Sequence, residues 1–256
     1  MTMLPPPSTG HAYFLDVDGT LIDLAPTPNG IRVDRNLAWL IEDVYRRCDG
    51  ALALISGRAL ADLDLRLPMA HLPMAGLHGL EWRLAAGAIQ RHSAGKSDIR
   101  SVHRQLLALC RRYPSLIVED KGIALALHYR SAPHLGSYLH RRVRALVDLA
   151  GGDLQIQPGK YVIEVKPSGC DKGSAIETFM ADAPFAGRPP VFIGDDQTDE
   201  HGFVVVNRLG GISIKVGRGR SQASYRLPNV AAVLGWLAQL GAHESAVGKE
   251  ETNAVA

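Results

Sequence analysis

The sequence predicts an α/β fold, in which a mostly parallel sheet covered by helices is interrupted by a smaller α+β domain. Short, fully apolar segments alternate with amphipathic helical patterns near both ends of the chain, as is typical of a parallel sheet covered on both faces. Between them the pattern changes to long helices and paired strands. A chain of 256 residues is long enough for one or two domains.

The first part of the predicted core alternates strands with helices. The expected strands are 12–15, 51–55, 73–77 and two arms of a hairpin, 81–84 and 88–90. Apolar residues at helical spacing predict a helix from Asp34, as N-cap, to Cys48, with Gly50 just past its end. A short second helix is expected to end near Leu67. The parallel strands therefore have their carboxyl ends at one edge of the sheet.

The middle of the chain follows a different order. Its expected elements are a helix to residue 113, strands at 116–120 and 123–129, a helix at 133–149, and strands at 154–157 and 161–166. Short glycine-containing turns between such strands are typical of antiparallel pairing. We therefore predict an α+β domain at 95–166, inserted into a core formed by residues 1–94 and 167–240. Residues 241–256 are small, polar and charged, and are expected to be a disordered tail.

The alternating pattern then resumes. Asp171 precedes a helix expected to reach Ala181. The remaining expected elements are a strand at 190–193, a helix, a strand at 212–216 and a helix at 230–240.

Composition excludes several classes of protein. The formal net charge is +2 and the arginine pairs are scattered, so we expect no nucleic-acid partner. No apolar stretch approaches the length that spans a bilayer, and the first residues lack the regions of a signal peptide. Cys48, Cys110 and Cys170 are too few for a disulfide framework or a zinc site and indicate free thiols in a reducing cytoplasm. The oligomeric state stays open, and a monomer is compatible with the sequence.

Acidic side chains gather where two expected strands end. These residues are Asp16, Asp18, Asp195, Asp196 and Asp199. Because the carboxyl ends of parallel strands share one crevice, we expect the two groups to meet. Closely spaced carboxylates repel without a cation, and such oxygen clusters suit Mg²⁺. The alternatives are an ordinary Asp-Gly turn for the first group and a capping box with Thr198 as N-cap for the second.

A hydroxyl and a cation are predicted at the same edge. Ser56 follows the second strand, and Lys172 opens a helix. A cation at a helix start is unfavourable unless an anion binds there. Both groups suit the oxygens of a phosphoryl group. A structural Ser-Gly turn and a solvated lysine are the alternatives.

Taken in this order, the motifs resemble those of the haloacid dehalogenase (HAD) superfamily of phosphotransferases. The matching motifs are Asp16-Val17-Asp18-Gly19-Thr20-Leu21, Ser56-Gly57-Arg58, Lys172 and Gly194-Asp195-Asp196. More narrowly, the chain resembles the trehalose-6-phosphate phosphatase family over roughly residues 12–240. That resemblance rests on segments 76–81, 118–122, 127–130 and 194–200. It implies a Rossmann-like core with an inserted α/β cap, Mg²⁺ as cofactor, a small-molecule sugar phosphate as substrate, and a role in trehalose biosynthesis.

The resemblance also implies a two-step reaction. Asp16 attacks phosphorus to form an aspartyl-phosphate, and Asp18 protonates the departing sugar oxygen and then deprotonates the hydrolytic water. Mg²⁺ is implied on the carboxylates of Asp16 and Asp195 and on the backbone carbonyl of Asp18. Asp196 and Asp199 either bind it directly or support the residues that do. The substrate phosphate is implied to contact Ser56 and Lys172, together with the other motif residues Gly19, Gly57 and Arg58.

Sugar recognition is assigned to the inserted domain. Glu119 and Lys121 share one face of a strand because their spacing is two. The resemblance implies that they bind glucose hydroxyls together with Glu164, while cross-strand ion pairs on a wet surface are the alternative. His78 is a candidate substrate contact where core and cap meet, with a structural histidine as the alternative.

Other functions use part of the same pattern. A phosphatase for sucrose phosphate or mannosyl-phosphoglycerate would keep the same core and differ in the cap. A glycosyltransferase also binds a metal through Asp-x-Asp, but nothing in it requires Ser56 and Lys172 at successive positions of one sheet edge. An inactive phosphosugar sensor would not need the complete catalytic set. We therefore expect a Mg²⁺-dependent phosphatase of trehalose 6-phosphate.

Overall fold

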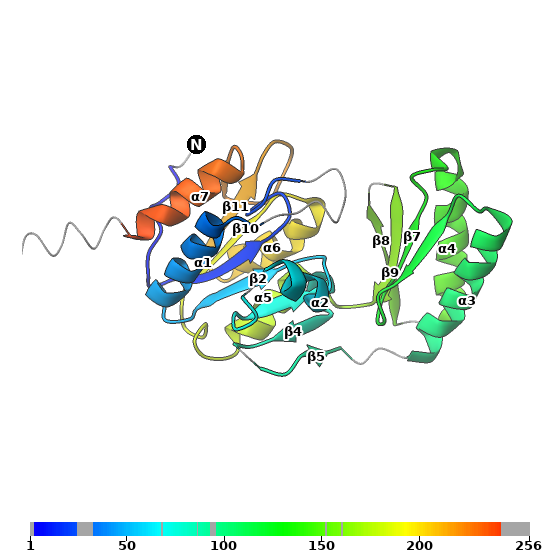
Figure 1. Cartoon of the computed structure of the whole chain (residues 1–256), viewed down its shortest axis with the longest axis horizontal. Helices are drawn as coiled ribbons and strands as arrows, with labels where there is room; N and C mark the ends of the chain where they lie inside the picture. The colour runs from blue at the N-terminus through cyan, green and yellow to red at the C-terminus, as the bar shows by residue number, and fades with distance from the viewer. Residues whose placement is uncertain are drawn as a thin grey trace, which may run out of the picture. The chain divides into compact units, whose positions relative to one another are not determined.

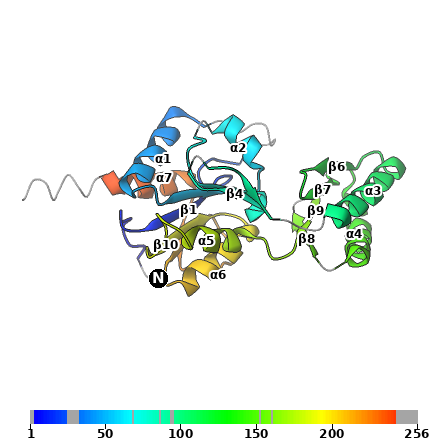
Figure 2. The same cartoon turned by 90° about the horizontal axis from the view of Figure 1, so that it is seen from below.

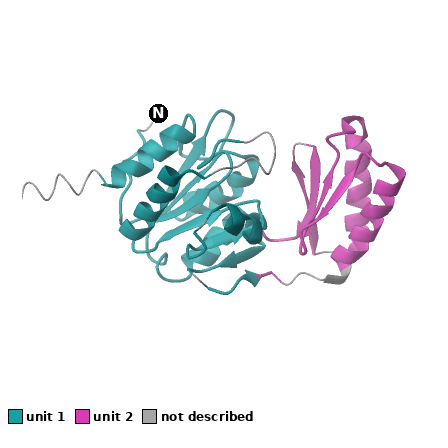
Figure 3. Cartoon of the chain, in the orientation of Figure 1, with its two compact units in different colours: residues 1–90, 171–256 teal, residues 91–170 magenta. Residues whose placement is uncertain are grey.

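The computed structural model divides the chain into two compact units (Figures 1 and 3). The core unit comprises residues 1–90 and 171–256, and the insert unit comprises residues 91–170. The structure describes residues 3–24, 33–67, 69–85, 87–92, 96–151, 153–159 and 161–241. The tail expected to be disordered lies, beyond Gly241, outside the described residues.

The core unit is built on a sheet with strand order β12-β11-β10-β1-β2-β3-β4-β5. The strands are β1 (Ala12–Asp16), β2 (Leu52–Ile55), β3 (Met74–Gly76), β4 (Glu81–Arg83), β5 (Gln90–Arg91), β10 (Pro190–Gly194), β11 (Ile212–Val216) and β12 (Tyr225–Leu227). Neighbours from β12 to β3 pair in parallel, and β4 pairs antiparallel with β3. The predicted α/β class is confirmed. The sequence analysis missed β12, because three residues with an exposed Arg226 carry too little alternation to indicate a strand.

Helices cover both faces of this sheet. They are α1 (Arg35–Arg47), α2 (Leu60–Arg66), α5 (Lys172–Met180), α6 (Glu200–Arg208) and α7 (Val230–Ala238). Figure 2 shows α1 and α7 on one face and α5 and α6 on the other. The predicted N-cap of α1 is confirmed, since the Asp34 side chain accepts a hydrogen bond from Leu37 N. Cys48 is fully buried at the end of α1, and all three cysteines are free thiols.

The register of the central strands determines which residues lie at the carboxyl edge of the core sheet. β1, β2 and β10 are buried along their whole length, which is why they read as continuous apolar runs. Leu15 lies opposite Ile193, and Asp16 lies opposite Ile55. The residues that follow these strands, Ser56 and Asp195, therefore lie at the same edge as Asp16.

The insert unit is an antiparallel sheet with helices on one face. Its strands pair in the order β6 (Ile117–Asp120), β7 (Leu125–His128), β9 (Val162–Pro167) and β8 (Leu154–Gly159). Helices α3 (Lys96–Arg112) and α4 (Gly136–Ala150) contact the sheet, and apolar residues such as Leu127, Ile163 and Val143 form a separate core between them. The opposite face of the sheet carries polar side chains.

None of the helices within the described ranges is both long enough and apolar enough to span a membrane.

Candidate active site

A buried lysine joins two carboxylates at the carboxyl edge of the core sheet. Asp16 ends β1 and is 3% exposed, and Lys172, the first residue of α5, is 2% exposed. Lys172 Nζ donates to Asp16 Oδ1 and to Asp199 Oδ1, each at 2.6 Å. Asp199 is completely buried. Buried charges persist only when they are paired and hydrogen-bonded, and this arrangement meets that requirement.

The charges in this group are not balanced. Burial raises the pKa of Asp16, and the Asp199 and Asp195 carboxylates add to this effect while Lys172 opposes it. Burial, followed by repulsion from Asp199 and Asp196, raises the pKa of Asp195 to about 6. Burial works against the charged form of Lys172, but Asp16 and Asp199 outweigh it and raise the pKa of the lysine. The excess of carboxylates over cations favours a bound cation here.

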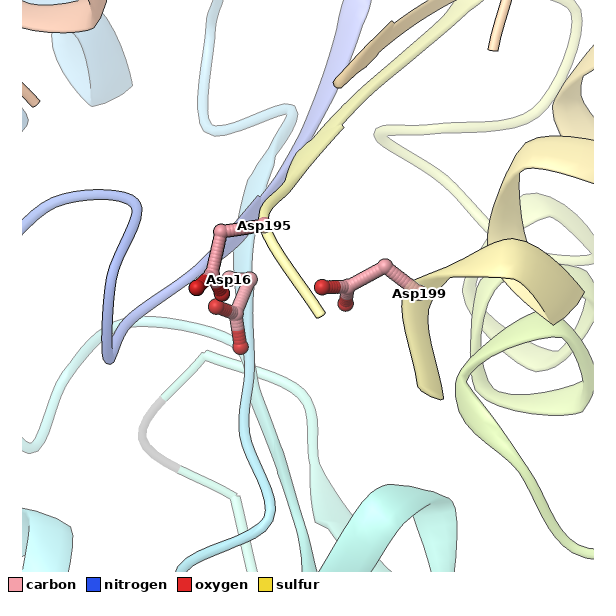
Figure 4. A group of neighbouring side chains, drawn as sticks. All are labelled: Asp16, Asp195 and Asp199. Atoms are coloured by element: carbon pink, nitrogen blue, oxygen red, sulfur yellow. The ribbon is translucent and has the colours of Figure 1, made fainter. Parts of the chain in front are cut away.

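The donor set fits a divalent cation. Asp16, Asp195 and Asp199 each offer an oxygen, and these oxygens lie within 4.8 Å of one another (Figure 4). Asp195 Oδ1 is buried and has no hydrogen-bond partner among the described residues. A Cβ at Gly19 would lie 2.2 Å from Asp195 Oδ2, so only glycine, here at φ +85°, lets the backbone approach this carboxylate. Carboxylate oxygens are the ligands that Mg²⁺ and Ca²⁺ prefer.

The three carboxylates are not equivalent. Both oxygens of Asp199 already accept hydrogen bonds, Oδ1 from Lys172 and Oδ2 from Asp196 N at 2.8 Å. Asp196 is exposed, and its Oδ1 accepts from Gln197 N at 2.5 Å. Its carboxylate lies outside the three-oxygen group. Asp195 is therefore better placed than Asp196 or Asp199 to join Asp16 on a cation.

The alternative of a capping box with Thr198 as N-cap is not what the structure shows, because the N-cap is Asp196, two residues earlier. Asp196 and Asp199 form a reciprocal capping box around a 3₁₀ turn, Gln197–Asp199. This turn precedes α6, whose own N-cap residue, Asp199, makes no side-chain capping hydrogen bond to the helix.

Arg58 holds the second carboxylate of the first motif. Its Nε donates to Asp18 Oδ2 at 2.7 Å and its Nη2 donates to Asp18 Oδ1 at 2.8 Å. Ser56 is 1% exposed, and its Oγ accepts from Arg58 N at 3.1 Å. The residue expected to contact substrate therefore grips Asp18 in this structure. This pair could not be predicted from the sequence, because the two residues lie 40 positions apart.

His78 lies against the Ser56 turn. Leu77, His78 and Gly79 all have positive φ, at 50°, 57° and 96°. His78 N donates to Ser56 O at 2.9 Å, and a Cβ at Gly57 would lie 2.6 Å from His78 Cε1. Left-handed non-glycine residues cost about 1–3 kcal/mol each and persist where their surroundings fix them. The turn at 77–79 thus supports the Ser56–Arg58 segment.

The acidic and basic candidates of the insert unit form pairs on the polar face of its sheet. Lys121 Nζ donates to Glu164 Oε1 at 2.7 Å. Glu119 and Glu164 flank Ala126 in register, so both side chains point to the same face. Glu119 accepts from His128 at 2.9 Å, and this hydrogen bond lowers the pKa of Glu119. His128 was not among the predicted site residues, although its alternation with Ala126 places it on this face.

Lys215 is a second residue that the sequence analysis missed. It is 6% exposed on β11, and its Nζ donates to the backbone carbonyl of Asp195. A cavity of about 610 Å³ opens beside Asp195 and Asp196 and is also lined by Lys215. The buried Lys215 therefore fixes the backbone at Asp195, where the second group of acidic residues begins.

Comparisons with known proteins agree with this architecture. Residues 14–231 match the sequence model of the trehalose-phosphatase family. The chain is 43% identical to the trehalose-6-phosphate phosphatase of Escherichia coli (strain K12) over 237 residues, which cover 93% of this chain and 89% of that protein. It is 40% identical to a probable trehalose-phosphate phosphatase of Sinorhizobium fredii, with 90% and 87% covered.

A solved structure is also similar. The crystal structure of a trehalose-6-phosphate phosphatase related protein superposes with a TM-score of 0.74 at 25% identity, over 91% of this chain and 99% of that one.

Proposed function

This chain belongs to the trehalose-phosphatase family, and we propose that it hydrolyses trehalose 6-phosphate to trehalose and phosphate through an aspartyl-phosphate on Asp16. It is a phosphoric monoester hydrolase of the HAD fold. The observation that carries the mechanism is the buried Asp16–Lys172–Asp199 group beside Asp195 at the strand edge. The family does not support the glycosyltransferase, sucrose phosphate or mannosyl-phosphoglycerate alternatives.

Mg²⁺ is the cofactor that we propose. Asp16 and Asp195 would hold it through their carboxylates and Asp18 through its backbone carbonyl, with Asp199 supporting Lys172 and Asp196 capping the loop. Bound there, Mg²⁺ would offset the repulsion between these carboxylates and the phosphate dianion.

In the first step, an Asp16 carboxylate oxygen forms a bond to phosphorus while the bond from phosphorus to the sugar oxygen breaks. The electron pair of the broken bond goes to the sugar oxygen, which takes a proton from Asp18. Lys172 and the Ser56 hydroxyl donate to the phosphoryl oxygens, and the tight Gly19 and Gly57 turns let the backbone approach them.

In the second step, Asp18 removes a proton from a water molecule as that water attacks the phosphorus of the aspartyl-phosphate. The bond to Asp16 breaks, and phosphate leaves with the carboxylate restored. Asp18 thus regains the proton that it gave up in the first step, so the cycle balances.

We assign sugar recognition to the polar face of the insert unit. Glu119, Lys121 and Glu164 offer charged hydrogen-bonding groups there, and their existing pairs can be exchanged for sugar hydroxyls. We assign His78 to support of the Ser56 turn, on the basis of its contacts with Ser56 and Gly57. We also propose a cytoplasmic location, which the free thiols of the three cysteines support.

Phosphate release over a panel of sugar phosphates tests this function. Trehalose 6-phosphate, sucrose 6-phosphate and glucose 6-phosphate are compared with Mg²⁺ present and after chelation. The proposal expects the highest kcat/KM for trehalose 6-phosphate and loss of turnover on chelation. A preference for another sugar phosphate would overturn the substrate assignment, and full activity in chelator would overturn the cofactor.

A further inference from the structure

Acidic and basic side chains alternate in a series of ion pairs formed by Asp18, Arg58, Asp62 and Arg66. Arg58 holds both oxygens of Asp18 through Nε and Nη2, and its Nη1 donates to Asp62 Oδ2 at 2.9 Å. Arg66 Nε donates to the other oxygen of Asp62, Oδ1, at 2.8 Å. Asp62 is therefore held between two arginines, one of which grips Asp18.

The positions of these four side chains restrict how the Arg58 guanidinium can move. Asp62 and Arg66 are four residues apart on α2, which places their side chains on one side of the helix. Arg58 lies two residues before the first residue of α2, and its side chain also contacts Asp62. Arg58 and Arg66 have side chains only 16% and 19% exposed, so neither moves freely in water. Because the guanidinium is planar, fixing Nη1 also fixes the directions of Nε and Nη2.

We propose that Asp62 is a positioning residue for phosphoryl transfer, which orients Arg58 and thereby aims the Asp18 carboxyl at the leaving-group oxygen. The inference rests on the proposed function, in which Asp18 donates the proton to that oxygen. Arg58 uses one lone pair on each Asp18 oxygen, so the donated proton sits on the second lone pair of one of them. Asp62 itself acts only through Arg58 and does not touch the substrate.

The proposal makes a prediction that a purely structural role does not. Proton donation matters most for a leaving group that is unstable as an anion and least for one that is stable. Phenyl phosphate and p-nitrophenyl phosphate are close in shape but differ in this property. The kcat/KM reports the steps up to formation of the phosphoenzyme, which include proton donation but not its later hydrolysis. The comparison therefore isolates the Asp18 proton donation.

Asp62→Asn removes the charge that fixes Arg58. General acid–base catalysis contributes roughly 10²–10⁴-fold, so partial misorientation of Asp18 should lower kcat/KM for phenyl phosphate by about tenfold. The loss for p-nitrophenyl phosphate should stay below about twofold. Asp62→Glu, which keeps the charge, should recover part of the phenyl phosphate activity.

Asp64→Asn is the matched control. Asp64 lies on the same helix with a side chain 31% exposed, against 33% for Asp62, and Arg83 grips both its oxygens at 2.8 and 2.5 Å. Its loss removes a comparable ion pair, but among the described residues Arg83 forms its hydrogen bonds with Asp64 and Met74 and not with Asp18. The control should change kcat/KM for both aryl phosphates by the same small factor.

Equal losses of Asp62→Asn on the two substrates, or behaviour identical to Asp64→Asn, would overturn the positioning role while leaving the phosphatase intact. A wild-type enzyme that hydrolyses no phosphomonoester would overturn the proposed function and this inference with it. Should Asp62→Asn fail to fold, Arg66→Gln provides the same test, because it frees one side of Asp62. We expect a smaller loss of about threefold, again confined to phenyl phosphate.

Discussion

The two units bury their paired charged side chains to different degrees, with the Lys121–Glu164 pair of the insert, at 17% and 15% exposure, lying between the extremes. In the core unit, Asp16, Lys172 and Asp199 are almost fully buried and are joined at 2.6 Å. In the insert unit, Glu119 and His128 form a pair whose side chains are 51% and 41% exposed. Charges interact strongly in a low-dielectric interior and weakly in water. Permanent ion pairs therefore suit the chemistry that we propose for the core, whereas exchangeable pairs suit the sugar recognition that we propose for the insert.

The largest expected effect is on the nucleophile. Asp16→Asn replaces the attacking carboxylate by an amide and removes a charged group from the proposed cation site. We expect turnover to fall by at least about 10³-fold on every phosphomonoester. Phosphate release by the purified variant measures this, with circular dichroism to confirm its fold. Activity within tenfold of the wild type would reject Asp16 as the nucleophile.

Lys172→Met tests the buried ion pairs of the core by removing their cation. It leaves Asp16 and Asp199 buried without their ammonium partner, which costs about 3–5 kcal/mol of stability for a broken buried pair. Loss of one preorganised donor to the phosphoryl group should also lower kcat by about 10²–10³-fold. Denaturant unfolding and steady-state kinetics give the two numbers. A variant as stable as the wild type would contradict the central role of this ion pair.

Asp195→Asn sharpens the assignment of the cation site. A ligand that binds only the folded state raises the melting temperature. We expect Mg²⁺ to raise the wild-type Tm, and the variant to need at least about tenfold more Mg²⁺ for the same rise, since even outer partners of metal ligands change affinity by about 10–100-fold. Asp196→Asn is the control and should behave as the wild type. An equal response of Asp195→Asn and wild type would place the cation elsewhere.

The sequence predicted most of the core because its strands are buried on both faces and end in polar residues. Asp16, Ser56 and Asp195 lie at the carboxyl ends of such strands, so topology alone predicted that they meet at one edge. The partners of Arg58 and Lys215 could not be predicted in this way, because a long side chain reaches a residue that the strand register does not specify. The same limit applies to His128, whose pairing with Glu119 depends on the alignment of two strands. Sequence reasoning located the strand ends better than the contacts that tie them together.

The division between a catalytic core and a recognising insert is tested most directly by Glu164→Gln. The variant is compared with Asp148→Asn, a control on the exposed surface of α4. Loss of a charge-assisted hydrogen bond, about 1.5–3 kcal/mol, should lower kcat/KM for trehalose 6-phosphate at least about tenfold. The rate with p-nitrophenyl phosphate, which has no sugar, should stay within about twofold of the wild type in both variants. Parallel losses on the two substrates, or no loss on trehalose 6-phosphate, would contradict sugar recognition by this face.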